Sequence, residues 1–249
     1  MDAYTARIAA SEQHVWLRTK HRPSGHADYR PPAEIIPFQR VQAAEETIAL
    51  VMLAPRVTSD LLVRVRDLRF CFDQIVIVLE DTTAGPVRLA DDEAMTVLER
   101  RIDGDFAGQR NAAQAIVKTG WAFHLDIDEW PDHSLLATMR PLAKLARQDG
   151  IDAVGFPRRN LVDGQMASLF PDTQYRLIRN HVRFVGAVHE RPDACNEWPR
   201  TTIALTGALD HFLSGERIEA RHRAYAQLGQ SADRNADLLA LRLPFWSTA

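Results

Sequence analysis

Short apolar runs separated by helical segments constrain the fold of this chain more than any other feature of its sequence. The runs TIALVMLA (47–54), QIVIVLEDTT (74–83) and WAFHLDID (121–128) have the length of strands. Their apolar parts show no polar alternation, which is typical of parallel strands covered by helices on both faces. Residues 58–70 between the first two runs place apolar side chains at helical spacing, after a threonine or serine that can cap a helix. This order predicts a parallel α/β sheet.

The remaining elements extend the same pattern. Residues 94–101 predict another strand, and 105–120 and 134–148 predict helices. Further along, 152–164 and 174–186 have the composition of strands and are expected to join the edge of the sheet in antiparallel orientation. The predicted fold class is therefore α/β, with a mostly parallel Rossmann-type sheet flanked by helices and with antiparallel edge strands.

Three regions follow from the same reading. Residues 1–46 predict a partly extended, Pro-rich N-terminal extension, 47–213 the α/β domain, and 214–249 a charged helical C-terminal tail. The tail carries Arg217, Arg221 and Arg223. A solvated helical face is the favoured interpretation of these arginines, and an acceptor site or a membrane surface is the alternative.

Charge and hydropathy exclude several classes of protein. A formal net charge of -3 gives no reason to expect a nucleic-acid partner. No run approaches the roughly 18 apolar residues of an integral membrane span. The first residues lack the basic-then-apolar order of a secretory signal. We therefore expect a cytoplasmic protein, with peripheral association at the inner membrane surface left open. Two cysteines suggest neither a disulfide framework nor a zinc site.

Two aspartates end the run at 121–128. Asp126 and Asp128 follow WAFHL and, at a spacing of two, project to the same side of an extended backbone. Water, a basic neighbour or a cation must relieve their repulsion, and a divalent cation with oxygen ligands is the interpretation we favour. The alternative is that the pair caps the next helix. Asp81 ends the preceding apolar run, and the carboxyl ends of parallel strands form the usual ligand-binding rim.

Two stretches carry a family resemblance. GQRNAAQAIVKTGWAFHLDIDEW (108–130) resembles the core of family-2 glycosyltransferases, in which an Arg-Asn-x-Ala helix precedes a strand ending in Asp-x-Asp. YRLIRNHVRFVGAVHE (175–190) is similar to the bacterial segment that begins with Arg-Leu-x-Arg-Asn and ends with Gly-x-Val-His-Glu. The order and spacing match over residues 47–190.

The resemblance implies a fold and a function. Family members have the GT-A fold, and the implied activity is metal-dependent transfer of a sugar, with inversion, from a UDP- or GDP-linked donor to a hydroxyl acceptor, as in cell-surface glycan synthesis. The acceptor would be a glycan, a lipid-linked sugar or a protein. Mn²⁺ or Mg²⁺, held by Asp126 and Asp128, would stabilise the leaving diphosphate. Asp81, with Glu80 as second candidate, would contact the nucleotide base or ribose.

Four further residues are donor-site candidates by the same resemblance. Arg110 and Asn111 open the helix that precedes the Asp-x-Asp strand and would lie near the donor. The alternative places Arg110 on the helix surface, paired with an aspartate of the preceding loop, either Asp103 or Asp105. Arg176 and Arg179 could each meet phosphate, but at a spacing of three they face opposite sides of a strand, so we expect only one to do so.

Inversion requires a base that takes the proton of the acceptor hydroxyl. Glu190 is the first candidate and Asp172 the second. His189 could contact the diphosphate or the cation, with a backbone-bonded histidine as alternative. His211 is a possible further cation ligand, and Trp130 could stack on a sugar at the acceptor site or belong to the core.

Two other functions compete with this reading. A non-catalytic sugar-nucleotide-binding or scaffolding protein of the same fold fits the short chain and the missing Glu-Asp base pair of many relatives. A nucleotidyltransferase fits less well, because that class needs a glycine-rich loop after the first strand. Here that loop reads LAPRVTSD (53–60) and has no glycine.

Overall fold

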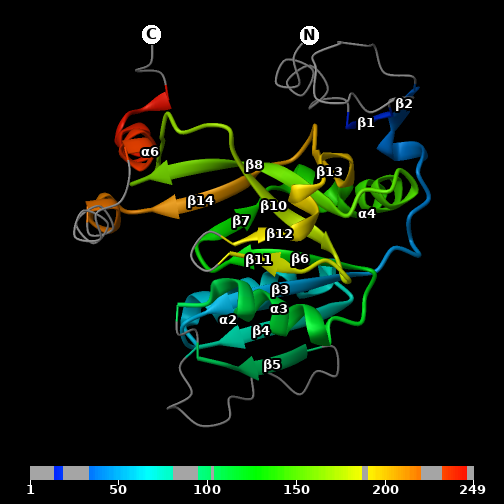
Figure 1. Ribbon diagram of the computed structural model, residues 1–249, viewed down its shortest axis with the longest axis horizontal. Coiled ribbons are helices and arrows are strands. Elements are labelled where there is room, and N and C mark those ends of the chain that lie inside the picture. Colours follow the sequence, from blue (N-terminus) through cyan, green and yellow to red (C-terminus); the bar gives the residue numbers. More distant parts are fainter. Residues whose placement is uncertain are drawn as a thin grey trace.

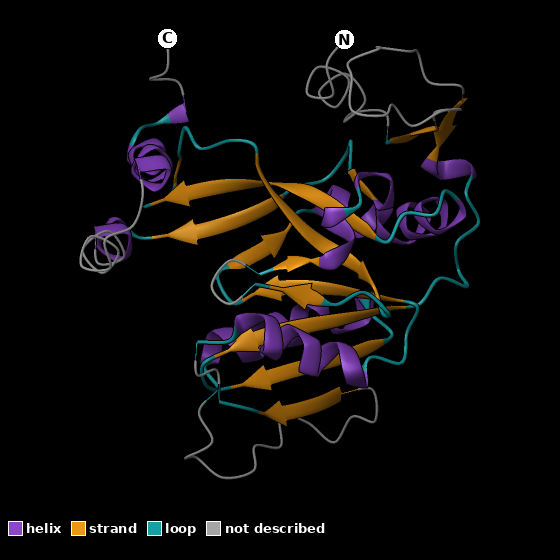
Figure 2. Ribbon diagram, viewed as in Figure 1, coloured by secondary structure: helices purple, strands orange, loops and turns teal. Residues whose placement is uncertain are grey.

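The computed structural model describes residues 14–18, 34–80, 95–101, 104–186, 190–219 and 232–245. Its described part is built around one large mixed sheet, with helices on both faces (Figures 1 and 2). The predicted α/β class is therefore confirmed. Two of the predicted site residues, Asp81 and His189, lie outside the described residues.

The parallel part of the sheet contains the apolar runs that the sequence singled out. Its strands are β3 (Ile48–Ala54), β4 (Gln74–Leu79), β5 (Met95–Glu99) and β6 (Trp121–Asp126). They lie in the order β5-β4-β3-β6, and all three pairings are parallel. Their carboxyl ends therefore share one rim, as predicted.

Longer strands extend the sheet beyond β6. The strand β10 (Asp172–Arg179) pairs antiparallel with β6 on one side and with β8 (Ala153–Val162) on the other. The strand β14 (Leu209–Leu213) then runs parallel to β8, and the short β7 (Glu129–Pro131) pairs antiparallel with β14 at the edge. Because β10 is antiparallel to both of its neighbours, β8 points in the same direction as β6, and so does β14.

Several short elements complete the described structure. They are the strands β1 (Val15–Arg18), β2 (Glu34–Pro37), β9 (Gln165–Met166), β11 (Phe184–Val185), β12 (Arg191–Pro192) and β13 (Thr201–Ile203), and the 3-10 turns η1 (Phe38–Arg40), η2 (Arg69–Cys71), η3 (Asp193–Asn196) and η4 (Trp198–Arg200). The pairs β1–β2 and β11–β12 are separate two-stranded sheets.

Alternating side chains of the parallel strands divide the core into two layers. One face of β3 contributes Ile48, Leu50 and Met52 to the main core, which is covered by α2 (Ser59–Leu68) and α4 (His133–Gln148). The other face packs its small side chains against α3 (Phe106–Ile116). Thr58, Asp105 and Asp132 cap the three helices by accepting backbone N–H groups. Each of these helices thus begins directly after a threonine or aspartate, residue types that favour the N-cap position.

The C-terminal helix α6 (Ala232–Arg242) lies beside the ends of β8 and β14 (Figure 1). Its Leu238 packs with Leu213 and Ile218, which belong to β14 and to the helical turn 215–219 that follows it. The backbone N–H of Ser168 donates to the carbonyl of Leu243 at 2.7 Å. The described parts of the tail are therefore helical and attached to the sheet.

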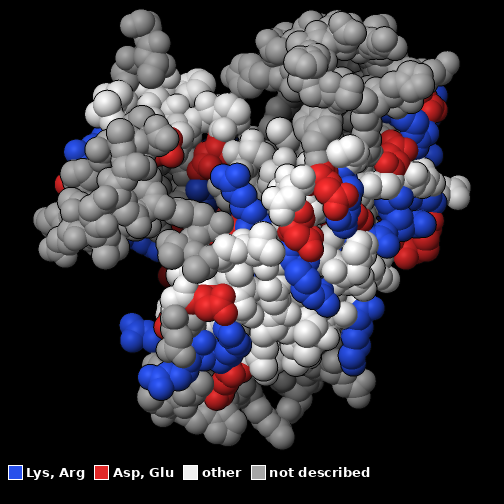
Figure 3. All heavy atoms as spheres, in the orientation of Figure 1, with Lys and Arg blue, Asp and Glu red and all other residues white. Residues whose placement is uncertain are grey.

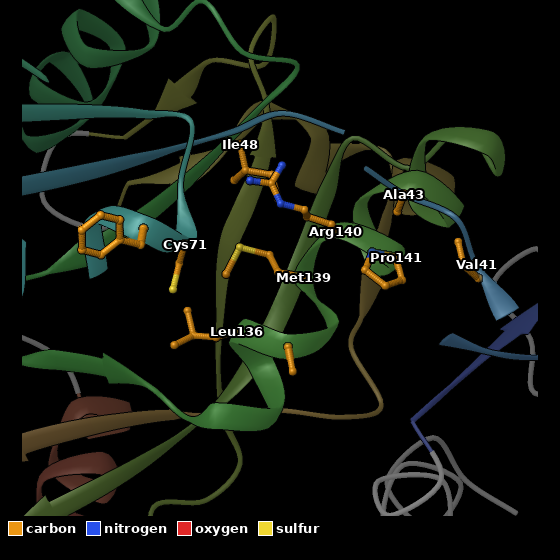
Figure 4. A pocket seen from close by; sticks show the side chains of 10 residues that line it. Val41, Ala43, Ile48, Cys71, Leu136, Met139, Arg140 and Pro141 are labelled. Atoms are coloured by element: carbon orange, nitrogen blue, oxygen red, sulfur yellow. The ribbon is translucent and has the colours of Figure 1, made fainter. Parts of the chain in front are cut away.

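A hollow of about 360 Å³, lined mostly by residues with apolar side chains, lies at the amino end of β3, away from the carboxyl rim (Figure 4). Leu136, Met139 and Cys71 contribute to its lining. The only charged side chain among its lining residues is Arg140, which is already paired with Asp73 at 2.9 Å. This hollow therefore has none of the chemistry that the sequence predicts for the site. None of the described helices is both long and apolar enough to cross a membrane.

Candidate functional site

The carboxyl rim of the sheet brings together residues that are far apart in the sequence. Asp126 ends β6, where it pairs with Leu53 of β3. Asp172 starts the inverted strand β10 at the same end of the sheet, opposite Arg158 of β8. His211 of β14 lies opposite Asn160 of β8 on one side and Glu129 of β7 on the other. The strand directions alone place these residues at one rim.

Seven side chains along this rim form an alternating series of ion pairs, here called the charge chain. In order, its members are Glu190, Arg110, Asp126, Arg176, Glu129, Arg158 and Asp172. Four carboxylates therefore alternate with three guanidinium groups, and the ionised charge chain carries a net charge of -1.

Asp126 lies between two arginines of the charge chain. Arg110 Nη2 donates to Asp126 Oδ1 at 2.8 Å, and Arg176 Nη2 donates to Asp126 Oδ2 at 2.5 Å. The same Arg176 nitrogen reaches Glu129 Oε1 at 2.6 Å. Both carboxylate oxygens of Asp126 thus face guanidinium groups, so basic neighbours neutralise this aspartate.

The two ends of the charge chain are the two candidate bases. Arg110 Nε donates to Glu190 Oε1 at 2.8 Å. At the other end, Arg158 Nη1 donates to Glu129 Oε1 at 3.0 Å, and Arg158 Nη2 donates to Asp172 Oδ2 at 2.5 Å. Glu190 and Asp172 are therefore connected through three arginines rather than being independent carboxylates.

The central members of the charge chain are buried. Arg110 and Arg176 are 3% and 5% exposed, and Glu129 is fully buried. Burial raises the pKa of Asp126, but the charges of Arg110 and Arg176 outweigh it and hold the pKa well below its usual range. Burial likewise lowers the pKa of Arg176, and the Asp126 and Glu129 carboxylates raise it overall. Each buried charge depends on its neighbours, because an unpaired one would be costly.

The surface alternative for Arg110 is wrong. Its side chain lies under α3 and points to the sheet, and Asp105 instead caps the helix and pairs with Arg100 at 3.4 Å. Asp103 lies outside the described residues. Asn111 donates from Nδ2 to the carbonyl of Phe184 and accepts the Phe184 N–H at Oδ1. Asn111 therefore ties α3 to β11, and its contact with a donor stays a prediction.

A fully buried histidine lies on the same face of β6 as Asp126. His124 packs edge-on against Phe184, with ring centroids 4.8 Å apart. Burial and the nearby positive charges of Arg110 and Arg176 lower its pKa well below the usual value. The imidazole is therefore neutral and adds no charge to the charge chain.

Asp128 lies outside the charge chain. The strand ends at Asp126, and a turn at residues 127–128 follows, so the two aspartates do not project to one side as an extended backbone would require. Asp128 Oδ2 instead lies 3.4 Å from His211 Nε2 and 2.7 Å from Arg217 Nη1. The helix-cap alternative for the pair is also wrong, because Asp132 caps α4.

Hydrogen bonds determine which ring nitrogen of a neutral His211 carries the proton. The Asn160 side-chain amide donates from Nδ2 to the carbonyl of Leu169 and to Asp172 Oδ2, so its Oδ1 is an acceptor. His211 Nδ1 lies 2.7 Å from this oxygen and must donate to it. In the neutral ring, Nε2 then presents a lone pair toward Asp128.

Two acceptor atoms that face each other at 3.4 Å need a positive charge nearby. A proton on His211 Nε2, the Arg217 guanidinium or a divalent cation can supply it. Burial raises the pKa of Asp128, and the hydrogen bond and charge of His211, with Arg217, lower it overall. A carboxylate oxygen and an imidazole nitrogen suit Mn²⁺ better than Mg²⁺, which prefers oxygen ligands, but no group of three potential metal-ligating side chains occurs among the described residues. A cation here would take its remaining ligands from substrate and water.

The other predicted site residues are dispersed. Arg179 faces away from Arg176 and lies over the Trp121 ring at 5.3 Å. Trp130 packs against the core and carries Arg64 over its ring, also at 5.3 Å. Glu80 is exposed just after β4. Their roles toward a donor or acceptor stay predictions.

Sequence reasoning missed two members of the site, Arg158 and Glu129, and gave Arg217 only as an alternative. Arg158 has the best signal, because it belongs to an arginine pair that directly follows the apolar first half of a strand. Glu129 adjoins the Asp-x-Asp motif, but nothing in the sequence shows that it is buried between two arginines. For Arg217 the sequence favours a solvated helical face, with an acceptor site or a membrane surface as the alternative, and the structure shows a half-exposed side chain in contact with Asp128.

We expect the stability of the protein to fall steeply in acid. Burial raises the pKa of Asp172, but Arg158, Asn160 and Gln174 lower it overall from the ordinary value of 3.8. Because the pKa is lower in the folded state, this stabilisation is complete above the unfolded value and is lost as the pH falls through the folded one. Urea unfolding between about pH 6 and pH 2.5 measures this loss, and Asp172→Asn should flatten the acidic slope. An unchanged slope in the variant would contradict the assignment.

Comparison with known proteins yields little. No protein-family model matches the chain, and no curated protein matches it. Among solved structures, the crystal structure of S. aureus TarS aligns with a TM-score of 0.40 and 11% sequence identity. The alignment covers 56% of this chain and 30% of that chain, so this protein matches under a third of the length of TarS. The site must be interpreted from its own geometry.

Proposed function

We propose that this protein is a metal-dependent, inverting glycosyltransferase of GT-A architecture. It would transfer a sugar from a UDP- or GDP-linked donor to a hydroxyl of a glycan, a lipid-linked sugar or a protein. The observation that carries the proposal is the Asp128–His211 pair, in which a carboxylate oxygen and an imidazole nitrogen, both able to ligate a metal ion, face each other at the carboxyl rim of the sheet.

The two stretches that resemble family-2 glycosyltransferases support the proposal by their positions. Residues 108–130 supply Arg110, Asp126 and Glu129 to the charge chain, and 175–190 supply Arg176 and Glu190. Stretches so far apart in sequence meet at one rim through side-chain ion pairs. The two motifs thus contribute to one contiguous set of side chains.

The donor diphosphate would lie beside Asp128 and His211. A divalent cation bound there would supply positive charge to the leaving diphosphate. Asp128 and His211 would hold it, with Asn160 fixing the ring so that Nε2 points to the cation. Asp126 is less suited to ligate it, because Arg110 and Arg176 occupy both of its oxygens. Its part would be to hold these arginines beside the donor.

Glu190 is better suited than Asp172 to take the acceptor proton. Asp172 accepts hydrogen bonds from Arg158, Asn160 and Gln174, and its pKa is lowered. A carboxylate held in this way is a poor base. Within the described residues, Glu190 is held by Arg110 alone, through Oε1. Its Oε2 would receive the proton as the hydroxyl attacks the sugar.

A non-catalytic sugar-nucleotide-binding protein is the second candidate. The neutralisation of Asp126 by two arginines favours it, since this half of the Asp-x-Asp motif is satisfied by protein groups alone. Such a protein would bind the nucleotide through its arginines and would not require a cation.

Calorimetric titration separates the two candidates. UDP, GDP and their sugar derivatives are titrated into the protein with Mn²⁺, with Mg²⁺ and with EDTA. We expect one nucleotide to bind per chain and binding to weaken at least about tenfold without the cation. Equal binding in EDTA would favour the non-catalytic candidate, and no binding to any nucleotide would refute both.

A further inference from the structure

Arg217 reaches the site from a short helical turn that directly follows β14. The backbone N–H of Arg217 donates to Ser214 Oγ at 3.2 Å, and that of Gly215 donates to Asp163 Oδ2 at 3.1 Å. The Ile218 N–H donates to the Ser214 carbonyl. These bonds fix the direction in which the turn leaves the strand, and so the side on which Arg217 emerges.

The C-terminal helix holds this turn against the sheet. Ile218 is buried with Leu213 and Leu238, and Val162 of β8 packs against the same cluster. On the outer side, Arg242 of α6 pairs with a glutamate of the turn, with Nη2 2.7 Å from Glu219 Oε1. Arg217 is therefore held at the rim through its backbone, while its half-exposed side chain reaches Asp128.

The guanidinium of Arg217 is half-exposed to solvent and contacts Asp128 at the point where a cation would bind. It contacts Asp128 Oδ2, the oxygen that also faces His211, yet its side chain is 51% exposed. The Asp128 side chain is only 16% exposed, but solvent screens the guanidinium, so we expect the pair to contribute about 1 kcal/mol and exchange of this partner to cost little. A cation bound between Asp128 and His211 would compete with Arg217 for the same oxygen.

We propose that Arg217 exchanges partners during substrate binding: it neutralises Asp128 in the absence of nucleotide and binds a phosphate oxygen of the nucleotide diphosphate when a cation occupies Asp128. This inference rests on the proposed function. Arginine suits the second state, because its planar guanidinium can donate two parallel hydrogen bonds to phosphate. Basic and acidic side chains are interspersed on the face of the molecule that Figure 3 shows.

Partner exchange predicts opposite effects on two affinities. In Arg217→Gln, the cation loses its competitor, so Mn²⁺ alone should bind about 3- to 5-fold more tightly. UDP or GDP at saturating Mn²⁺ loses a charged hydrogen-bond donor and should bind about 10-fold more weakly or worse. A residue that only supports the fold would change both affinities in the same direction.

The experiment measures free Mn²⁺ by electron paramagnetic resonance and nucleotide binding by calorimetry. The wild type is compared with Arg217→Gln, Arg217→Lys and the surface control Arg66→Gln, and circular dichroism checks the fold. Arg66 is 71% exposed and pairs only with Asp67 among the described residues, so its replacement should change neither affinity. Arg217→Lys keeps the charge and should restore part of the nucleotide affinity.

The possible outcomes are distinct. Tighter Mn²⁺ binding together with weaker nucleotide binding in Arg217→Gln supports the exchange. If the wild type binds Mn²⁺ and nucleotide and Arg217→Gln binds both equally well, or both more weakly, the exchange is overturned while the proposed function stands. If the wild type binds neither, the proposed function and the exchange both fail.

Discussion

Methionine in place of Arg176 is expected to lower the free energy of unfolding by about 3–5 kcal/mol, because the change leaves the buried Glu129 and the partly buried Asp126 without their shared counter-ion. Glu129 is fully buried and would keep only Arg158, and Asp126 would keep only Arg110. Methionine has a similar length and no charge, so the loss reports the ion pairs rather than a cavity. Urea unfolding at pH 7 measures it.

A second replacement tests this explanation. Glu129→Met in the Arg176→Met background removes one charge of each sign and leaves two intact parts, Glu190–Arg110–Asp126 and Arg158–Asp172. The double variant should therefore be more stable than Arg176→Met alone, and the two effects should be far from additive.

The matched control is Arg66→Met. Arg66 is exposed and pairs with its neighbour Asp67, so its loss should cost less than about 1 kcal/mol. Equal losses at Arg66 and Arg176, or additive effects of Arg176→Met and Glu129→Met, would contradict the charge chain as a coupled unit.

Asparagine at position 128 is expected to reduce sugar transfer by about 10²–10³-fold, the scale on which loss of one charge-stabilising group acts on a reaction. Asn keeps the shape of the side chain and still accepts a hydrogen bond from Arg217, but it is a weak metal ligand. The change in stability should stay below about 1 kcal/mol. Release of UDP or GDP from the donor identified by titration provides the assay.

Asp67→Asn is the matched control for this prediction, because Asp67 lies on the exposed side of α2. It should leave the rate unchanged. Equal rates for Asp128→Asn and the wild type would contradict a cation at Asp128. A wild type that binds nucleotide but shows no transfer with any acceptor would favour the non-catalytic candidate.

The sheet could be predicted because its signals are local. Apolar runs at 48–54, 74–79 and 121–126 become parallel strands, and the helices between them begin at capping residues. The position of Asp126 at the carboxyl rim follows from strand direction. These features depend on spacing and composition, which a single sequence contains.

The partners of the site residues could not be predicted in this way. Whether Arg110 faces solvent or the sheet depends on the seating of α3, and the position of Arg176 depends on the register shift between Tyr175 and Leu177 in β10. The turn at residues 127–128 separates two aspartates that an extended strand would place together. Tertiary pairing decided each of these, and it leaves no periodic pattern.

The charge chain also has a mechanical consequence. Each inner member forms ion pairs with two neighbours, so displacing one side chain would remove a counter-ion from a neighbouring charge. The rim should therefore behave as a stiff platform whose shape hardly differs between empty and loaded protein. The solvent-exposed side chains around the rim would therefore have to move when a substrate binds. These side chains would also control the access of the substrate to the site.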